Sequence, residues 1–387
     1  MVAESVLPTH ARLPASSFLA DRHACLRRRF STLSLDAFVV SCPSNTRYLS
    51  NHTGSSGVLI ITRDSLHLLV DFRYREAVQL LQQSPAACPN LAIRDVSTSY
   101  DEALLDCLID LGASVVGFEA GHVPVAAHER WLRMAGERGF TITLVSTEGL
   151  AEEARAIKDS FEISTLREAA TRLTPVAAAV FDAVRVGETE RAIARMIDAE
   201  IRNAGYERSA FDTIVASGPH SALPHHRPGD RVMAEGDLVV LDFGGVLDGY
   251  CCDLTRMVSI GPPSPEARRL YDAVYDAHQA AIAAVRPGVE STTVDTVVRG
   301  LLDERGLGKA FGHGTGHGLG LDVHELPRIT RARADIASVL LEPGMIFTIE
   351  PGAYLPGFGG VRIEDDVVVT EKGCEVLTAV PHGLHRR

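Results

Sequence analysis

The sequence has few cysteines and none of their usual pairings. Seven cysteines, an odd number, are scattered over 387 residues, and no two form a CxxC pair. This pattern favours reduced thiols over a disulfide framework. Cys251 and Cys252 are neighbours in an expected strand, so their side chains point to opposite faces and cannot hold one zinc ion together.

Long apolar segments and long basic runs are also missing. The opening MVAESVLPTHARLPASS lacks the apolar core of a signal peptide, and no run of about eighteen apolar residues could span a bilayer. We therefore expect a cytoplasmic protein without membrane contact. Fifty acidic against 38 basic residues give a net charge of −12 without a long basic run, which disfavours nucleic acid as a partner.

What is present is ordinary globular composition, with 45% apolar and 23% charged residues. A chain of 387 residues exceeds the size at which one core usually keeps growing, so we expect two domains, over residues 1–152 and 153–387. In the first, short β-like runs alternate with helical stretches, which predicts a small α/β domain. The β-like runs are 35–42, 56–63, 66–73, 91–96 and 113–119, and the helical stretches include 74–83 and 101–112.

The second domain shows a coarse doubling. Helical sequence over 160–205 leads to strand-rich sequence over 211–260, and the order repeats over 265–306 and 309–371. No fixed short period is present, so this pattern indicates a duplicated αβ unit around one central site and not a solenoid.

Two aspartates lie in the strand-rich stretch LVVLDFGGVLDGYCCDLTRM, residues 238–257. Asp248 and the following glycine signal a two-residue hairpin, which pairs Asp242 with Thr255 and Asp253 with Gly244. Both carboxylates then emerge on one face as diagonal neighbours, within reach of one ion or an ion pair.

Two glutamates repeat this logic in the second half. Glu350 ends the strand MIFTIE, Glu364 starts another, and the connection YLPGFGG between them can close a hairpin. Four converging carboxylates would repel one another and raise their pKa values strongly without a cation. A divalent metal relieves this repulsion.

The stretch FGHGTGHGLGLDVHE carries His313, His317 and His324 among alternating glycines. No register fits GxGxxG, and a GxxxxGK[ST] phosphate loop is absent, so a nucleotide site is excluded. An HExxH zinc motif is broken by Arg328, and no GxSxG nucleophile elbow occurs. The glycines can instead let the backbone approach a crowded site closely.

These residues resemble the dinuclear pita-bread metallopeptidases, which include methionine aminopeptidase, aminopeptidase P and prolidase. The similarity covers residues 160–376 and the strings SALPHH, GHGTGHGLGLDVHE, TIEPGAY and GVRIEDD. The strings NTRYLSNHTGSSGVLIIT and LLVDFRY also resemble the amino-terminal domain of the Xaa-Pro members. The resemblance implies an α+β protein, with a creatinase-like α/β domain followed by a pita-bread catalytic domain.

The resemblance also implies a ligand set for two divalent ions. Asp253 and Glu364 would bridge the ions, Asp242 would complete one, and His317 and Glu350 the other. This mostly oxygen set suits manganese first, and cobalt, iron or zinc are compatible. Two cations lower the pKa of a bridging water until hydroxide is available to attack the peptide carbonyl, with Glu350 as general base.

Further roles come with the resemblance. His225 and His324 would stabilise the carbonyl oxyanion, and His313 would line the proline pocket. Arg362 lies two residues before Glu364 on the same strand face, so we expect it to orient the ligand carboxylates from behind. Two simpler alternatives remain open: His313 bonded only to backbone, and Arg362 only neutralising the acids. His220 and His226 are expected to be solvent-facing or structural.

The expected function is hydrolysis of the bond between an amino-terminal residue and proline. Aminopeptidase P acts on longer peptides and prolidase on dipeptides, and no motif in the sequence separates these types. A homodimer is expected, as in the family. The alternative is a metal-free creatinase-like hydrolase or a non-catalytic binding relative.

Overall fold

The computed structural model describes residues 11–333 and 337–387. The chain divides into two compact units, Met1–Arg155 and Ala156–Arg387. We describe each unit by itself. The predicted boundary between residues 152 and 153 lies close to this division.

The first unit contains one six-stranded sheet in the order β4-β3-β2-β1-β5-β6. Strands β1, β2 and β3 are antiparallel neighbours, whereas β4, β5 and β6 pair in parallel with β3, β1 and β5. Two of its helices begin at a capping side chain: Asp71 accepts from the backbone of Arg73 at the start of α3, and Ser99 accepts from the backbone of Glu102 at the start of α4. The strands are β1 Ala37–Val40, β2 Val58–Thr62, β3 Leu66–Val70, β4 Leu91–Asp95, β5 Val115–Glu119 and β6 Thr143–Thr147; the helices are α1 Ser16–Leu33, α2 Pro43–Ser50, α3 Phe72–Leu81, α4 Tyr100–Leu111, α5 Val125–Glu137 and α6 Glu152–Ala156.

All five predicted strands and both predicted helices of this unit are confirmed. Strand β6 and the helices α1, α2, α5 and α6 were not predicted. Strand β6 reads TLVST, and α2 reads PSNTRYLS, so neither carries a clear apolar period. For α2, tertiary packing favours the helix, since five of its eight residues are buried.

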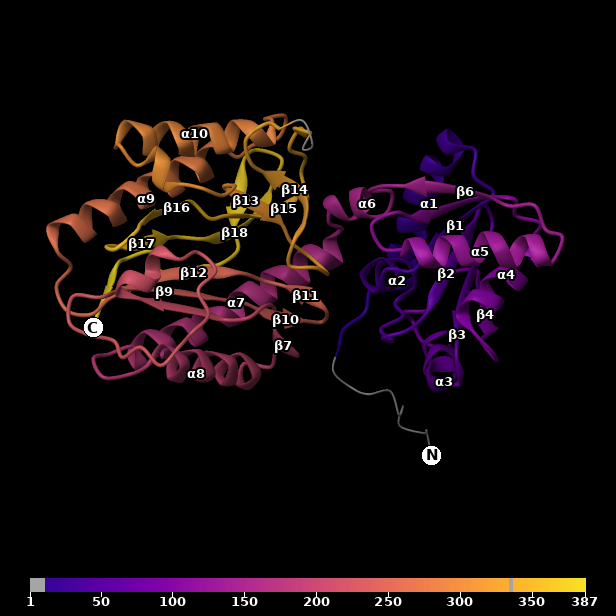
Figure 1. Cartoon of the computed structure of the whole chain (residues 1–387), viewed down its shortest axis with the longest axis horizontal. Coiled ribbons are helices and arrows are strands. Elements are labelled where there is room, and N and C mark those ends of the chain that lie inside the picture. The colour runs from indigo at the N-terminus through magenta and orange to yellow at the C-terminus, as the bar shows by residue number, and fades with distance from the viewer. Residues whose placement is uncertain (1–10, 334–336) are drawn as a thin grey trace. The chain divides into compact units, whose positions relative to one another are not determined.

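The second unit has two helix pairs with strands between them (Figure 1). The pair α7 Ser160–Ala183 and α8 Glu190–Asn203 shares one apolar core with β9 and β12. The pair α9 Pro265–Ala284 and α10 Ser291–Glu304 covers a second core. The order of helices and strands follows the predicted doubling.

The strands of this unit form four small sheets, ordered β20-β12-β9-β8, β14-β13-β15-β18-β19, β11-β10-β7 and β16-β17. A bridge between Thr255 and Glu364 links the two halves. The strands are β7 Arg208–Ser209, β8 Ile214–Ser217, β9 Leu238–Phe243, β10 Gly245–Leu247, β11 Tyr250–Cys251, β12 Leu254–Ser259, β13 Gly316–Gly318, β14 Glu325–Ile329, β15 Ile346–Ile349, β16 Gly352–Leu355, β17 Gly359–Arg362, β18 Asp365–Val369, β19 Cys374–Val376 and β20 His385–Arg386; two short 3₁₀ helices are η1 Gly218–Ala222 and η2 Gly308–Ala310.

The first acid-bearing hairpin has the predicted register. Asp242 pairs with Thr255, and the turn at Asp248 and Gly249 has φ angles of 48° and 80°, as a two-residue turn of the I′ type requires. Asp248 therefore turns the chain and is not part of the site.

The second hairpin is also confirmed. Strands β16 and β17 pair Gly352 with Arg362, and the adjoining pair Ile349 and Asp365 keeps the same register. This register places Glu350 across from Glu364.

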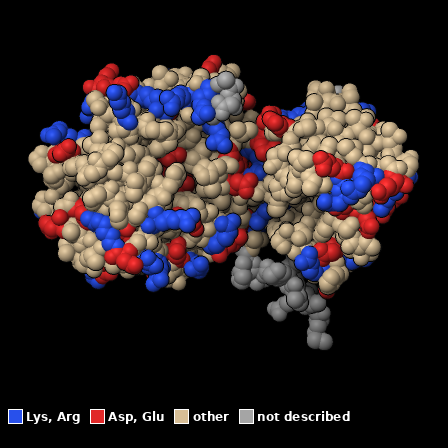
Figure 2. Space-filling model, viewed as in Figure 1, with Lys and Arg blue, Asp and Glu red and all other residues tan. Residues whose placement is uncertain are grey.

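The apolar helices and the surface charges can also be located in the structure. Within residues 11–333 and 337–387 no helix is long and apolar enough to cross a membrane, and charges of both signs are interspersed on the face seen in Figure 2.

Candidate metal centre

A cavity of about 580 Å³ opens in the second unit. It is lined by all nine residues that the sequence analysis selected, which come from both halves of the unit. They are His225, Asp242, Asp253, His313, His317, His324, Glu350, Arg362 and Glu364. The two hairpins and the glycine-rich stretch therefore meet at one place.

The two aspartates are buried and only partly satisfied. Asp242 accepts a hydrogen bond from Arg362 through Oδ2, but its Oδ1 has no partner. Oδ1 of Asp253 likewise has no partner. A buried carboxylate oxygen without a donor is costly, so both aspartates present oxygens suited to a cation.

The two glutamates differ in their surroundings. Glu364 accepts a hydrogen bond of 2.6 Å from the Thr255 hydroxyl, while Glu350 lies 3.6 Å from His317 Nε2. Burial, together with the charge of Asp253, raises the pKa of Glu364 well above its ordinary value. Burial also raises the pKa of Glu350 to about 8, although Arg362 opposes this shift.

The donor set fits divalent metal. One ligand atom each from Asp253, His317 and Glu364 lies within 4.8 Å of the others. Burial lowers the pKa of His317 to about 4, so its imidazole is neutral and can act as a ligand. With Nδ1–H donating to the Gly318 carbonyl at 3.1 Å, the lone pair of Nε2 remains available on the side of Glu350.

Arg362 is buried beneath this cluster. Its guanidinium donates to Asp242, to the Tyr354 hydroxyl at 2.9 Å and to the Thr255 hydroxyl at 3.2 Å. It therefore fixes the Asp242 carboxylate and the Thr255 hydroxyl, which itself donates to Glu364, and it offsets part of the negative charge. These contacts are compatible with both roles that the sequence left open for Arg362, orienting carboxylates and neutralising them.

Of the histidines that line the cavity, the three predicted to contact the substrate differ in how firmly they are held. His313 is fixed, because Nδ1 lies 2.8 Å from the Gly314 carbonyl and Nε2 lies 2.9 Å from the Tyr354 hydroxyl. His324 is exposed and its ring lies 4.3 Å from that of His317. His225 is also exposed. The last two are free to meet a molecule in the cavity.

Several lining residues were missed by the sequence analysis. Arg227 and Arg333 belong to the cavity wall, as does Arg328, which the sequence analysis noted only as the residue that breaks HExxH. Tyr354, which bonds both His313 and Arg362, stands in the quoted string TIEPGAY. Charge and position in the string were available signals, but nothing in the sequence reveals which way these side chains point.

Two glycines have the role that the sequence suggested. A Cβ atom added at Gly316 would lie 1.8 Å from the carbonyl oxygen of Thr348, and one at Gly318 would lie 2.1 Å from that of Leu326. These strands can therefore approach only without side chains. At Gly312, by contrast, no atom lies within 4 Å of such a Cβ.

The comparison with protein families decides the identity of the fold. Residues 164–371 match the model of metallopeptidase family M24. This chain belongs to family M24. Residues 22–157 match the creatinase/prolidase amino-terminal domain, so the predicted pairing of this domain with a pita-bread catalytic domain is confirmed.

This M24 chain is similar to several proteins over nearly its whole length. It is 36% identical to the uncharacterized peptidase YqhT of Bacillus subtilis over 93% of this chain and 98% of that protein. Among solved structures, the Xaa-Pro dipeptidase from Bacillus anthracis has a TM-score of 0.88 and 34% identity, covering 95% of this chain and 100% of the other. The X-Pro aminopeptidase from Thermotoga maritima has a TM-score of 0.83 and 33% identity, covering 94% and 99%.

Proposed function

We propose that this M24 protein is a dimetal exopeptidase that cleaves the bond between an amino-terminal residue and proline. The observation that carries the proposal is the gathering of four carboxylates and one neutral imidazole around one cavity, with buried oxygens on Asp242 and Asp253 left without donors. In a metal-free hydrolase or binding module, buried carboxylate oxygens without hydrogen-bond donors would be a net cost to stability.

The proposed ligands are Asp242, Asp253, His317, Glu350 and Glu364. Two divalent ions bound there would supply positive charge that polarises a peptide carbonyl and activates water. Manganese is the first choice for a set of four carboxylates and one imidazole. Arg362 would hold Asp242 in its ligating orientation through the contact described above.

The remaining residues would act on the peptide and on protons. Glu350 is the proposed general base, because its carboxylate faces the cavity and can accept a proton from the attacking water. His225 and His324 would donate hydrogen bonds to the carbonyl oxygen as negative charge develops on it. His313, fixed by Tyr354, would form part of the wall against which proline packs.

The proposal covers both dipeptides and longer peptides. The structural neighbours named above are described as a dipeptidase in one case and an aminopeptidase in the other. A dipeptide places its free carboxylate inside the cavity, where the side chains of Arg227, Arg328 and Arg333 line the wall. This cationic wall supports the dipeptidase alternative.

The proposed setting is a cytoplasmic homodimer. All seven cysteines are free thiols, which suits a reducing compartment. Light scattering on the purified protein tests the dimer. A monomer would contradict the proposed dimer but not the proposed metal centre, because the lining residues of the cavity all come from one chain.

The deciding experiment measures metal content and hydrolysis together. We expect purified protein supplied with Mn²⁺ to bind two ions per chain and to hydrolyse Xaa-Pro and Xaa-Pro-Yaa peptides, with Gly-Gly as a control substrate. Asp253→Ala and Glu364→Ala should each lower kcat/KM by roughly 10³-fold or more, because each removes a proposed ligand to both ions.

Two results would contradict the proposal. One is a protein that binds no divalent ion and stays inactive after Mn²⁺ is added. The other is an Asp253→Ala variant that keeps wild-type activity and metal content. The ratio of turnover on Xaa-Pro to turnover on Xaa-Pro-Yaa then separates the dipeptidase from the aminopeptidase type.

A further inference from the structure

A second cluster of titratable groups lies beside the cavity, around Glu190. This glutamate is the first residue of helix α8, and its side chain is completely buried. Both carboxylate oxygens face the segment from Ser217 to Gly229, which leaves strand β8, passes through the short helix η1 and returns along the cavity wall.

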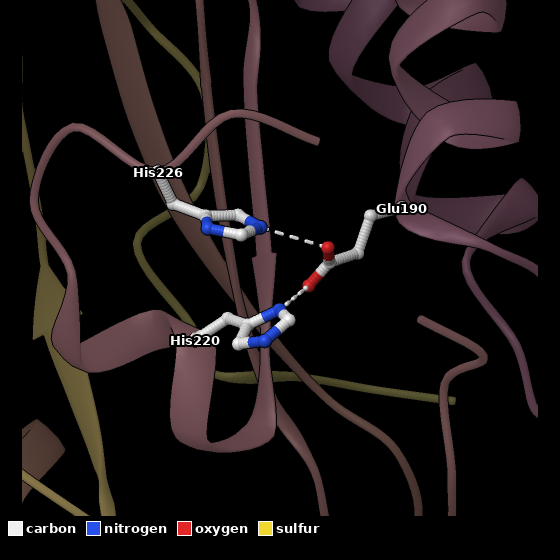
Figure 3. Close-up of side chains that lie close together, drawn as sticks. All are labelled: Glu190, His220 and His226. Carbon is white, nitrogen blue, oxygen red and sulfur yellow. Dashed lines mark hydrogen bonds and ion pairs between the residues drawn. The ribbon is translucent and has the colours of Figure 1, made fainter. Parts of the chain in front are cut away.

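Five hydrogen bonds join Glu190 to that segment. Oε1 accepts from the Ser217 backbone at 2.9 Å, from the Ser217 hydroxyl at 2.8 Å and from His220 Nδ1 at 3.0 Å. Oε2 accepts from His226 Nε2 at 2.8 Å and from the Gly229 backbone at 3.2 Å. Figure 3 shows the two imidazoles approaching the carboxylate from different parts of the loop.

Two histidines and a carboxylate could also hold a metal ion, but the hydrogen bonding favours another role. Both oxygens of Glu190 are satisfied by protein donors, whereas Asp242 and Asp253 each leave one buried oxygen without a partner. Burial alone would raise the pKa of Glu190, yet the hydrogen bonds from Ser217, His226 and Gly229 lower it to about 2. The ionised carboxylate is thus complete without a cation.

The segment that Glu190 holds carries His225. His225 is exposed, while the residues on both sides of it are fixed. The Pro224 carbonyl accepts from Arg362 Nη1 at 3.3 Å, and His226 donates to Glu190. His225 is therefore placed by its neighbours in the chain.

We propose that Glu190 is a positioning residue that fixes His225 in the cavity by fastening the loop on either side of it. The inference rests on the proposed function, in which His225 donates to the substrate carbonyl. An ionised acceptor is required, because five hydrogen bonds from residues 217–229 converge on the one carboxylate. Without it the loop gains freedom, and the geometry that His225 needs in the transition state is populated less often.

The test begins with Glu190→Gln, which keeps the side-chain volume but replaces one acceptor oxygen with a donor. We expect kcat on an Xaa-Pro peptide to fall by roughly ten-fold or more, with KM changed less than about three-fold and the metal content unchanged. Glu190→Asp, which keeps the charge, should recover part of the loss. Ser217→Ala removes one donor only and provides a milder variant if Glu190→Gln does not fold.

A double-mutant cycle with His225→Ala separates positioning from general structural support. If Glu190 acts through His225, Glu190→Gln should cost little further activity once His225 has been removed. Hydrogen exchange gives a readout without turnover: amides of residues 217–229 should exchange faster in Glu190→Gln than in the wild type.

Glu162→Gln is the matched control, because Glu162 is also a buried carboxylate of this unit but does not line the cavity. It should affect stability without coupling to His225→Ala. Additive losses in the Glu190 cycle, or wild-type kcat in Glu190→Gln, would overturn the inference. Wild-type protein that fails to cleave Xaa-Pro peptides would instead overturn the proposed function, and the exchange experiment would still report on the loop.

Discussion

At the scale of single residues, buried carboxylates in this protein are of two kinds. Glu190 is ionised because donors surround it, and its pKa is lowered to about 2. Glu350 is buried among other acids, and its pKa is raised to about 8. The first carboxylate is stabilised in its ionised form by protein donors, whereas ionisation of the second is unfavourable in the chain alone.

This difference predicts the pH dependence of the metal-free protein. Because the pKa of folded Glu350 lies above its ordinary value of 4.5, its contribution to stability is complete below about pH 4.5. That contribution is lost as the pH rises through about 8. Protein treated with EDTA should therefore lose unfolding free energy between pH 5 and 8.5 in urea titrations.

Two comparisons check the cause of this loss. Glu350→Gln carries no titrating carboxyl at that position, so its metal-free stability should fall less steeply over the same pH range. Added Mn²⁺ should remove most of the slope in the wild type, because bound cations offset the buried charge. An identical slope in wild type and variant would show that Glu350 is not the group responsible.

The acidic residues of the cavity could be predicted from the sequence, but the residues that hold the surrounding loops in place could not. Asp242, Asp253, Glu350 and Glu364 are conspicuous because charged residues interrupt or adjoin apolar strands. Glu190 stands in TERAIARM, where an acid in the first turn of a helix usually faces solvent and helps the helix dipole. Its burial depends on a loop that joins it only in the folded chain.

At the scale of elements, turn chemistry determined how much was predictable. The dipeptide at Asp248 and Gly249 fixed one hairpin register, and the glycine-rich connection allowed the other. Alternating apolar runs identified five strands of the first unit. Elements without a clear apolar period, such as β6 and α2, were not predicted, because contacts distant in sequence determine their conformation.

Close backbone approach at Gly316 gives a prediction at this scale. Gly316→Ala should destabilise the protein by about 2–4 kcal/mol and lower activity, because the new methyl group would overlap the Thr348 carbonyl and displace the strand before His317. Thermal unfolding and Xaa-Pro hydrolysis measure the two effects.

Gly312→Ala is the matched control in the same stretch, since the added methyl group meets no atom within 4 Å. It should leave stability within about 0.5 kcal/mol of the wild type, as for a surface substitution. Equal effects at both positions would mean that backbone freedom, and not close packing, explains the glycines.

At the scale of the whole molecule, the second unit consists of two halves with the same order of helices and strands. Thr189 bridges to Val232 just before α8, and Glu290 bridges to Leu340 just before α10. The α8 half contributes Asp242 and Asp253 to the cavity, and the α10 half contributes Glu350 and Glu364. Each half of the predicted repeat therefore contributes two of the four proposed carboxylate ligands.

The cavity belongs to the second unit alone, which predicts that residues 156–387 retain the metal centre. We expect this fragment to fold with its own two apolar cores and to bind the same number of Mn²⁺ ions per chain as the full protein. Calorimetric metal titration measures this number, with the full chain as reference. A fragment that is folded by circular dichroism but binds no metal would show that the first unit is required.

The bridge between Thr255 and Glu364 gives the site an order in time. Glu364 follows Asp253 by more than a hundred residues, so a ribosome makes both aspartates well before the last proposed ligand is available. The proposed metal pair could therefore be held by its full ligand set only after the strand that carries Glu364 has joined the strands of the first half.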